Sequence, residues 1–292
     1  MATPPSPEVP LSDLVFTVLD TETTGVDLDH GHEIIELGMV RCRQEKVLGT
    51  YSGLFQPSVP QTDEALRIHR INPAELASAP PFAEAVEGVV DFIGETVIAA
   101  HNLLFDLTFI DTSLKRLGRP PLPNWAFDTI RLSSELWPEY ECHCLRCLGP
   151  SLELSQSGTH RALDDALATA GLLERIIGEL ENRGRGTLRH LHPVRGDFTW
   201  PDGDVHCRLR ERLLEAIDKE TTLELVLYNK DECFYYRQKL LPSKLDGGRL
   251  FGIIPDKDTE TAIPLYNVIS ADPARPKPAV KLTTEAQRTQ RG

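Results

Sequence analysis

The chain has 292 residues, of which 40% are hydrophobic and 26% are charged, and this composition excludes a disordered or fibrous protein. At roughly 150 residues per domain, the length predicts two domains. No apolar run approaches the roughly 20 residues of a membrane helix, and the proline-rich start lacks the features of a signal peptide. We therefore expect a cytosolic protein with no membrane partner.

The charge of the chain is unevenly divided. The net charge of −13 by itself argues against a nucleic-acid partner, because proteins that bind polyanions are usually basic. Residues 1–182 hold 12 Lys and Arg against 28 Asp and Glu, a balance of −16, whereas residues 183–292 hold 19 against 16, a balance of +3. The acidic first part and the mildly basic second part therefore need separate interpretations.

In the first 182 residues, short apolar runs rich in β-forming residues are followed by segments with helical spacing. We expect strands, in chain order, at residues 14–19, 33–41, 47–55 and 96–100. Apolar residues at helical spacing predict helices near residues 82–93, 109–117 and 163–180. Strands that come first and then alternate with helices predict an α/β fold, with a mixed sheet and helices packed on it.

The remaining chain predicts one helix followed by a small antiparallel sheet or barrel. The helix is expected near residues 209–217, and the strands at 223–228, 233–241, 249–254 and 262–269. The predicted division of the chain is a disordered tail 1–11, a first domain 12–182, a basic linker 183–204, a small β domain 205–272 and a disordered tail 273–292.

Six cysteines are spread over the chain, and in a cytosolic protein free thiols are expected rather than a disulfide framework. Three of them, Cys142, Cys144 and Cys147, are close enough in sequence to suggest a zinc site. No second Cys or His pair follows at the spacing of a zinc finger or ribbon, so the sequence favours ordinary packing for this cluster over structural zinc.

Two carboxylates mark the end of the first expected strand. Asp20 and Glu22 are two residues apart, so both side chains point to the same face of the sheet. Carboxylates placed together repel each other unless a cation lies between them, and such oxygen ligands suit Mg²⁺ or Mn²⁺. Thr23 and Thr24 can donate hydrogen bonds to a bound group, and Gly25 permits a tight turn. A solvated acidic turn is the alternative for this segment taken alone.

Two further acidic segments follow, and each has an ordinary alternative. Asp106 comes after the strand at 96–100, and His160 and Asp165 come at the start of the last helix of the first domain. Acidic residues in a first helical turn often only complement the helix dipole. By default, Phe105 is a core residue and His160 a residue at a helix start.

Together, the three segments resemble the DEDDh family of 3′→5′ exonucleases, which includes the proofreading epsilon subunit of bacterial DNA polymerase III. The motifs are D-x-E-x-T-G from Asp20, H-N-x-x-F-D ending at Asp106, and H-x-A-x-x-D from His160 to Asp165. The resemblance covers about residues 12–182. It implies a ribonuclease H-like fold and a bacterial, cytoplasmic enzyme.

The resemblance also implies the roles of the site residues. Two Mg²⁺ or Mn²⁺ ions would be bound by four carboxylates, those of Asp20, Glu22, Asp106 and Asp165, and His160 would be the general base. The terminal nucleotide would be held by Thr23, Asn102 and Phe105. Two divalent ions stabilise charge on both the attacking and the leaving oxygen, and a histidine accepts a proton near neutral pH.

The expected function is therefore hydrolysis at the single-stranded 3′ end of a nucleic acid, with DNA favoured over RNA, in repair or proofreading, beside a polymerase or repair partner. The expected grip on the nucleic-acid backbone consists of Arg183, Arg185 and Arg189. An exoribonuclease is one alternative. Another is a protein that senses nucleic acid or an effector and whose C-terminal domain regulates the nuclease.

The C-terminal segment 205–272 is similar in layout to a WYL domain, a small SH3-like barrel of bacterial regulators. It departs from that family at the name-giving tripeptide, where Leu250-Phe251-Gly252 stands in place of Trp-Tyr-Leu. The ligand binding typical of such domains is therefore not implied for this chain.

Overall fold

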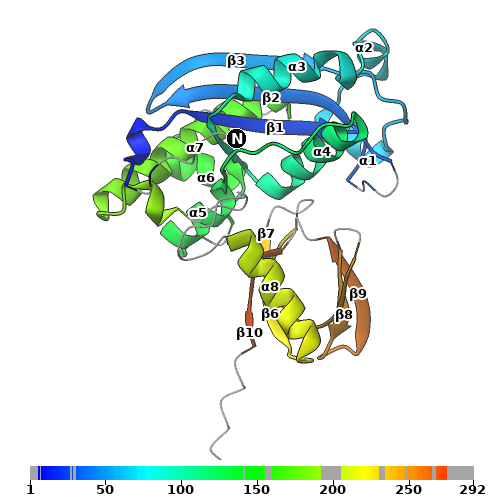
Figure 1. The fold of residues 1–292 in the computed structure, drawn as a ribbon, viewed down its shortest axis with the longest axis vertical. Helices are drawn as coiled ribbons and strands as arrows, with labels where there is room; N and C mark the ends of the chain where they lie inside the picture. The colour runs from blue at the N-terminus through cyan, green and yellow to red at the C-terminus, as the bar shows by residue number, and fades with distance from the viewer. Residues whose placement is uncertain are drawn as a thin grey trace, which may run out of the picture.

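The computed structural model describes residues 6, 8–26, 28, 31–140, 142–154, 160–191, 205–229, 234–246, 249–264 and 268–274. These residues form two five-stranded sheets, one with the order β3-β2-β1-β4-β5 and one with the order β10-β6-β7-β8-β9 (Figure 1).

The first sheet is mixed, as expected for an α/β fold. Its strands are β1 (Phe16–Thr23), β2 (Ile34–Arg43), β3 (Lys46–Leu54), β4 (Val97–Ala100) and β5 (Ala126–Asp128). The first three strands pair antiparallel, and β4 and β5 continue the sheet parallel to β1. The four strands predicted from the sequence are present. The fifth, β5, has only three residues, which is too short to show a periodic pattern.

Helices cover both faces of this sheet. They are α1 (Asp63–His69), α2 (Pro73–Ala77), α3 (Phe82–Ile93), α4 (Leu103–Arg116), α5 (Thr129–Leu136), α6 (Leu145–Leu152) and α7 (Ala162–Asn182). Val18 belongs to the core beneath α5, α6 and α7, whereas the next residue, Leu19, belongs to the core beneath α3 and α4. Because side chains alternate along a strand, Asp20 and Glu22 follow Val18 to the face covered by α7.

The ends of the first domain differ from the sequence prediction. Leu11, expected in a disordered tail, is fully buried in a short 3₁₀ helix, η1 (Leu11–Asp13). The preceding Pro10 forms a β-bridge with Thr187, and Leu188 lies in the same core. The end of the expected tail and the start of the expected linker therefore pack together, because both carry apolar side chains that the core buries. Residues 192–204 and 275–292 of the predicted linker and C-terminal tail lie outside the described residues.

The second sheet is entirely antiparallel and follows helix α8 (Val205–Asp218). Its strands are β6 (Leu223–Asn229), β7 (Phe234–Asp246), β8 (Arg249–Ile254), β9 (Thr259–Pro264) and β10 (Val268–Pro273). This confirms the expected helix and small β domain. The prediction of one strand at 262–269 is wrong, because this range includes parts of two strands. Strand β9 pairs with β8, whereas β10 pairs with β6 at the other side of the sheet. In the described part of the chain, no helix has the length and apolarity needed to span a membrane.

Gly38 in β2 lets helix α7 approach the sheet closely. A Cβ atom at this position would lie 2.1 Å from the backbone nitrogen of Leu163 and 2.2 Å from the carbonyl carbon of Ala162. Both atoms are backbone, so they cannot move aside as a flexible side chain could. The first turn of α7 is therefore seated on β2 at a position where only glycine fits.

We predict that Gly38→Ala lowers the free energy of unfolding by about 1–3 kcal/mol, because the added methyl group forces α7 away from β2. Gly88→Ala is the matched control. It lies within α3, where a Cβ would meet nothing within 4 Å, so this change should be neutral or slightly stabilising. Chemical denaturation of both variants measures the difference, and equal stabilities would contradict the close approach.

Candidate active site

The end of β1 and the first turns of α7 bring three acidic side chains together. Carboxylate oxygens of Asp20, Glu22 and Asp165 all lie within 4.8 Å of one another. Glu22 is buried, and the other two are half-buried. The sequence predicted all three as neighbours, although 143 residues separate Glu22 from Asp165 along the chain.

The register of β1 and β2 explains this meeting. Asp20 lies opposite Gly38 and Glu22 lies opposite Glu36 in the antiparallel pair. Gly38 and Glu36 of β2 both contact the start of α7. The carboxylates of β1 therefore lie beside the place where α7 is seated, and Asp165 is in the first turn of that helix.

Asp106 comes to the same strand from the opposite face of the sheet. Its Oδ1 atom accepts hydrogen bonds from the backbone N–H of Thr21 at 2.8 Å and from the Thr21 hydroxyl at 2.7 Å. Thr21 stands between Asp20 and Glu22 on β1, so these bonds hold Asp106 at the same part of the strand, although its carboxylate is not among the three that cluster within 4.8 Å. With 2% of its surface exposed, Asp106 is the most deeply buried of the four.

This donor set fits a divalent cation. Three carboxylate oxygens lie close enough together that small side-chain rotations would let one ion bind all three, and hard oxygen ligands are those that Mg²⁺ and Mn²⁺ prefer. The nearby guanidinium of Arg161 is directed to Glu36, with N–O distances of 2.7 to 3.1 Å. The acidic cluster is therefore a candidate metal centre.

Glu36 holds the start of α7 through both of its carboxylate oxygens. Besides Arg161, it accepts the backbone N–H of Ala162 at 3.0 Å, one of the helix N-terminal groups that have no partner within the helix. Only 1% of Glu36 is exposed, so these bonds form away from water. The sequence analysis assigned no role to this glutamate.

We predict that Glu36→Gln destabilises the fold by about 1–3 kcal/mol, because the amide cannot accept all the bonds that the buried carboxylate accepts. It should also reduce nuclease activity, because α7 carries Asp165. Glu33→Gln is the control: Glu33 accepts bonds from Ser58, away from α7. Thermal unfolding and nuclease assays should separate the two variants. Equal effects of the two substitutions would show that Glu36 does not hold the start of α7.

His160, the predicted general base, lies two residues before α7 begins. It is exposed, and its backbone has a left-handed conformation, with φ of 46°. This conformation turns the chain sharply at the entrance to the helix that carries Asp165. The role of His160 as a base stays a prediction.

The two threonines predicted to contact substrate are engaged within the protein. The hydroxyl of Thr23 donates to the carbonyl of Gly25 at 2.8 Å. That of Thr24 accepts the backbone N–H of Glu33 at 3.0 Å and lies 2.9 Å from Nδ1 of His32. Both hydroxyls shape the turn after β1, and their contact with a nucleotide stays a prediction.

The side chains of Asn102 and Phe105 differ in whether they can bind a ligand in their present positions. The Asn102 side chain is buried at the start of α4, and its Oδ1 atom has no hydrogen-bond partner among the described residues. A ligand that donates a hydrogen bond would satisfy this buried acceptor. The Phe105 ring is 3% exposed and packs in the core 4.9 Å from the Phe109 ring. Its predicted role in stacking on a base would need the ring to leave this packing.

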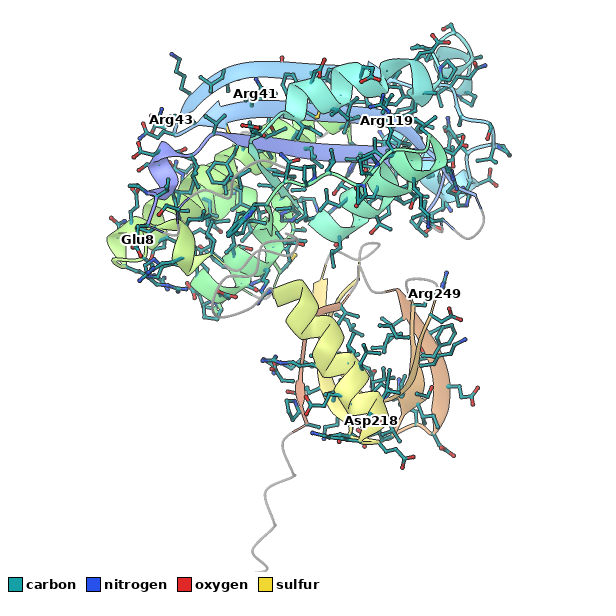
Figure 2. All side chains as sticks on the ribbon, in the orientation of Figure 1. Glu8, Arg41, Arg43, Arg119, Asp218 and Arg249 are labelled. Carbon is teal, nitrogen blue, oxygen red and sulfur yellow. The ribbon has the colours of Figure 1, made fainter. Side chains whose placement is uncertain are left out.

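The arginines of the predicted backbone grip already have partners in the fold. Arg183 donates to Glu179 at 2.7 Å and to the carbonyl of Leu136 at 2.8 Å. Arg189 pairs with Glu8, which is labelled in Figure 2. Arg185 has a weak contact with the carbonyl of His190, at 3.5 Å. A phosphate would have to compete with these contacts, so the grip stays a prediction.

Asp128 and His101 support the site and were not predicted to do so. The Asp128 carboxylate accepts the backbone N–H of Leu103 at 3.0 Å and that of Ile130 at 2.8 Å, and so ties α4 to α5. Burial raises its pKa to about 6 although backbone hydrogen bonds oppose this shift. The Nδ1 atom of His101 lies 3.0 Å from the Thr129 hydroxyl. Burial, and then the charge of His143, lower the pKa of His101 to about 3.

We predict that His101 makes the fold sensitive to acid. The unfolded chain binds a proton on this side chain near pH 6.5, whereas the folded chain does so only near pH 3. The free energy of unfolding should therefore fall as the pH drops through this window, by up to about 1.4 kcal/mol per pH unit. His101→Gln should flatten that fall and leave the behaviour above pH 7 unchanged. Denaturation at several pH values checks this, and an unchanged slope would contradict it.

Comparison with known proteins gives one family over the first part of the chain. A protein-family model described as exonuclease matches residues 17–173. DNA polymerase III PolC-type of Halalkalibacterium halodurans is 30% identical over 253 residues, which cover 82% of this chain and 17% of that protein. DNA polymerase III PolC-type of Staphylococcus epidermidis is 26% identical over 288 residues, 90% of this chain and 19% of that protein. The chain thus spans less than a fifth of the length of these relatives.

Among solved structures, a 3′-exonuclease with specific 3′-end recognition of a histone mRNA stem-loop is similar to this chain. The TM-score is 0.51 and the identity 15%, over 68% of this chain and 77% of that one. At this identity the likeness concerns the fold, and it confirms the ribonuclease H-like architecture expected from the sequence.

Proposed function

This chain belongs to the exonuclease family, and on that premise we propose that it is a divalent-metal-dependent 3′→5′ exonuclease that acts on DNA. Membership confirms the enzyme class expected from the sequence, a nuclease that removes nucleotides from the end of a nucleic acid. The observation that supports the metal dependence is the cluster of Asp20, Glu22 and Asp165 oxygens within 4.8 Å.

The four carboxylates would hold two Mg²⁺ or Mn²⁺ ions, with Asp20, Glu22 and Asp165 around one and Asp106 supporting the other. Such ions would stabilise the charge that develops on the phosphate oxygens during hydrolysis. The carboxylates stand on a strand and on two helices, so their positions are set before substrate binds. The buried, unpaired Oδ1 atom of Asn102 would accept a hydrogen bond from the terminal nucleotide.

His160 would take the proton from the attacking water on an imidazole nitrogen. Its exposed position before α7 leaves the ring open to solvent, which suits a group that must pass the proton on. Glu36 accepts hydrogen bonds from Arg161 and Ala162, the residues that follow His160 in the chain. These bonds would therefore position the base as well as Asp165.

DNA is the preferred substrate class in this proposal because the relatives reported above are DNA polymerases of the PolC type. A single-stranded 3′ end is proposed as the site of attack, in proofreading or repair, with a polymerase as the partner. The bacterial cytoplasm is the matching compartment.

We predict that Asp20→Asn and Asp165→Asn each reduce nuclease activity by more than about 100-fold, since even groups that only support metal ligands contribute 10- to 100-fold. Asp164→Asn is the matched control. It changes the neighbouring acid, which is outside the cluster, and should keep most of the activity. Circular dichroism verifies folding. Activity of Asp165→Asn near that of the native protein would remove the metal centre from the mechanism.

The decisive assay uses single-stranded DNA, duplex DNA and RNA of one sequence, each labelled at either end, with Mg²⁺, Mn²⁺ or a chelator. We expect 5′-labelled DNA to shorten progressively and 3′-labelled DNA to release its label at once, with no reaction in the chelator. Faster digestion of RNA would support the exoribonuclease instead. Immediate release of a 5′ label would contradict the proposed polarity.

A further inference from the structure

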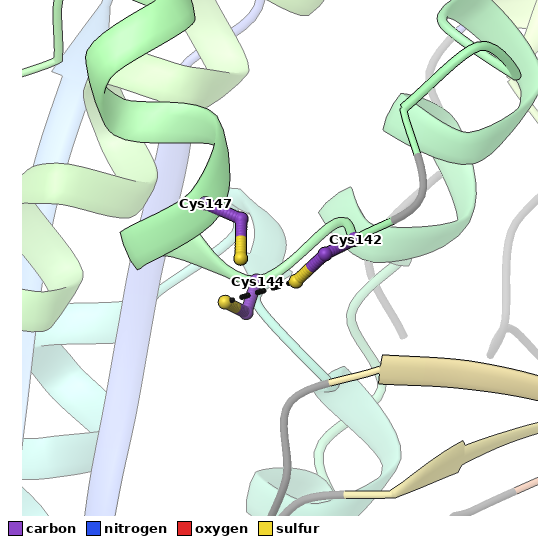
Figure 3. A group of neighbouring side chains, drawn as sticks. All are labelled: Cys142, Cys144 and Cys147. Carbon is purple, nitrogen blue, oxygen red and sulfur yellow. Dashed lines mark hydrogen bonds between the residues drawn. The ribbon is translucent and has the colours of Figure 1, made fainter.

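Three cysteines gather where the chain after α5 enters α6: Cys142 precedes the helix, Cys144 is its N-cap and Cys147 lies in its first turn. The sulfur atoms of Cys142, Cys144 and Cys147 all lie within 4.8 Å of one another, and Cys142 and Cys144 are in hydrogen-bond contact at 3.3 Å (Figure 3). All three are free thiols. Cys144 is buried, Cys142 is half-buried and Cys147 is exposed, so the group is closed on one side and open to solvent on the other.

The separations match those of a thiolate metal site. Zinc–sulfur bonds of about 2.3 Å in a tetrahedral arrangement place the sulfur atoms about 3.8 Å apart. Sulfur atoms between 3.3 Å and 4.8 Å apart need only small rotations of the side chains to reach this separation. No second cysteine or histidine pair follows in the sequence at the spacing of a zinc finger or ribbon, but three protein ligands suffice where a small ligand takes the fourth position.

The three thiols stand at the start of a helix. Cys144 is the N-cap of α6, so all three sulfurs lie near the positive end of that helix. Burial, and then the neighbouring Cys147 thiol, raise the pKa of the Cys142 thiol above its ordinary value, and hydrogen bonds with Cys144 offset only part of this shift, so without a metal Cys142 is a protonated thiol. A metal ion would displace the protons shared among the three sulfurs.

The loop is already held in this shape by a neighbour of the cysteines. The Nδ1 atom of His143 lies 3.1 Å from the Ser133 hydroxyl of α5, so this ring turns into the protein. His143 is buried and is not among the clustered ligand atoms. Among the described residues, the cluster therefore offers three protein ligands, of which Cys147 is exposed.

We propose that Cys142, Cys144 and Cys147 form a second metal site, which binds one Zn²⁺ through three thiolates and a solvent-derived fourth ligand. Bound there, Zn²⁺ braces the connection between α5 and α6. Leu136 at the end of α5 and Leu148 in α6 share the core with Leu172 of α7, the helix that carries Asp165. The site is chemically distinct from the acidic cluster, because soft sulfur ligands select zinc where oxygen ligands select Mg²⁺ or Mn²⁺.

The test is a cobalt titration of the 292-residue chain, purified under reducing conditions and stripped of metal. Co²⁺ bound to thiolates gives a sulfur-to-metal charge-transfer band, which Co²⁺ on carboxylates does not give. We expect this band to saturate near one ion per chain, to vanish on addition of Zn²⁺, and to be lost in Cys142→Ser/Cys147→Ser. Cys42→Ser, a free cysteine in β2, is the matched control and should keep the band.

The result also separates this site from the proposed nuclease centre. Asp165→Asn should keep the cobalt band while it loses nuclease activity. Absence of the band in the native protein overturns the proposal, as does a band that survives in the double cysteine variant. Mass spectrometry that finds a disulfide within the cluster after reducing purification also overturns it, and would identify the cysteines as a redox pair instead.

Discussion

The contact between strand β2 and the first turn of α7 is the constraint on which the candidate active site depends. Gly38 removes the side chain that would keep the helix away, and Glu36 supplies a buried carboxylate that accepts the free N–H of Ala162. Both residues lie directly across the sheet from the acidic residues of β1. The same contact therefore seats the helix and sets the distance from Asp165 to Asp20 and Glu22.

A second set of buried polar bonds joins the helices to the ends of the strands. Thr21 binds Asp106 from the first turn of α4, and Asp128 at the end of β5 binds the N-termini of α4 and α5. Buried carboxylates such as these lose much of their hydration, and the hydrogen bonds that they accept from backbone N–H groups offset part of that loss. The acidic residues are therefore held by elements of the fold rather than by flexible loops.

The two proposed metal sites differ in chemistry but belong to one layer of the domain. One uses carboxylates where α7 meets β1, and the other uses cysteines between α5 and α6, which pack against α7. The acidic charge of the first 182 residues, which at first argued against a nucleic-acid partner, is partly concentrated at the first site. There, bound cations would reverse the local field that a phosphate meets.

Much of this protein could be predicted from its sequence because the relevant signals are local. Alternation placed Asp20 and Glu22 on one face of a strand, helical spacing located α3, α4 and α7, and the three motifs indicated the nuclease family. Short elements such as β5 escaped prediction because three residues show no period. Leu11 was assigned to a tail because the residues that it meets, Gly186 by a backbone hydrogen bond and Leu188 in the core, are far away in sequence.

Only the tertiary structure decided which of these residues meet and which are withdrawn. In the folded chain, the hydroxyls of Thr23 and Thr24 bond within the turn after β1, and Phe105 is buried in the core. Glu36 binds the first backbone N–H of α7 and so holds the helix on β2. The tertiary structure also brought three cysteine sulfurs within 4.8 Å of one another. The physical reason is the same in each case. Sequence patterns report the direction of a side chain relative to its own strand or helix, whereas packing sets the distance to residues on other elements.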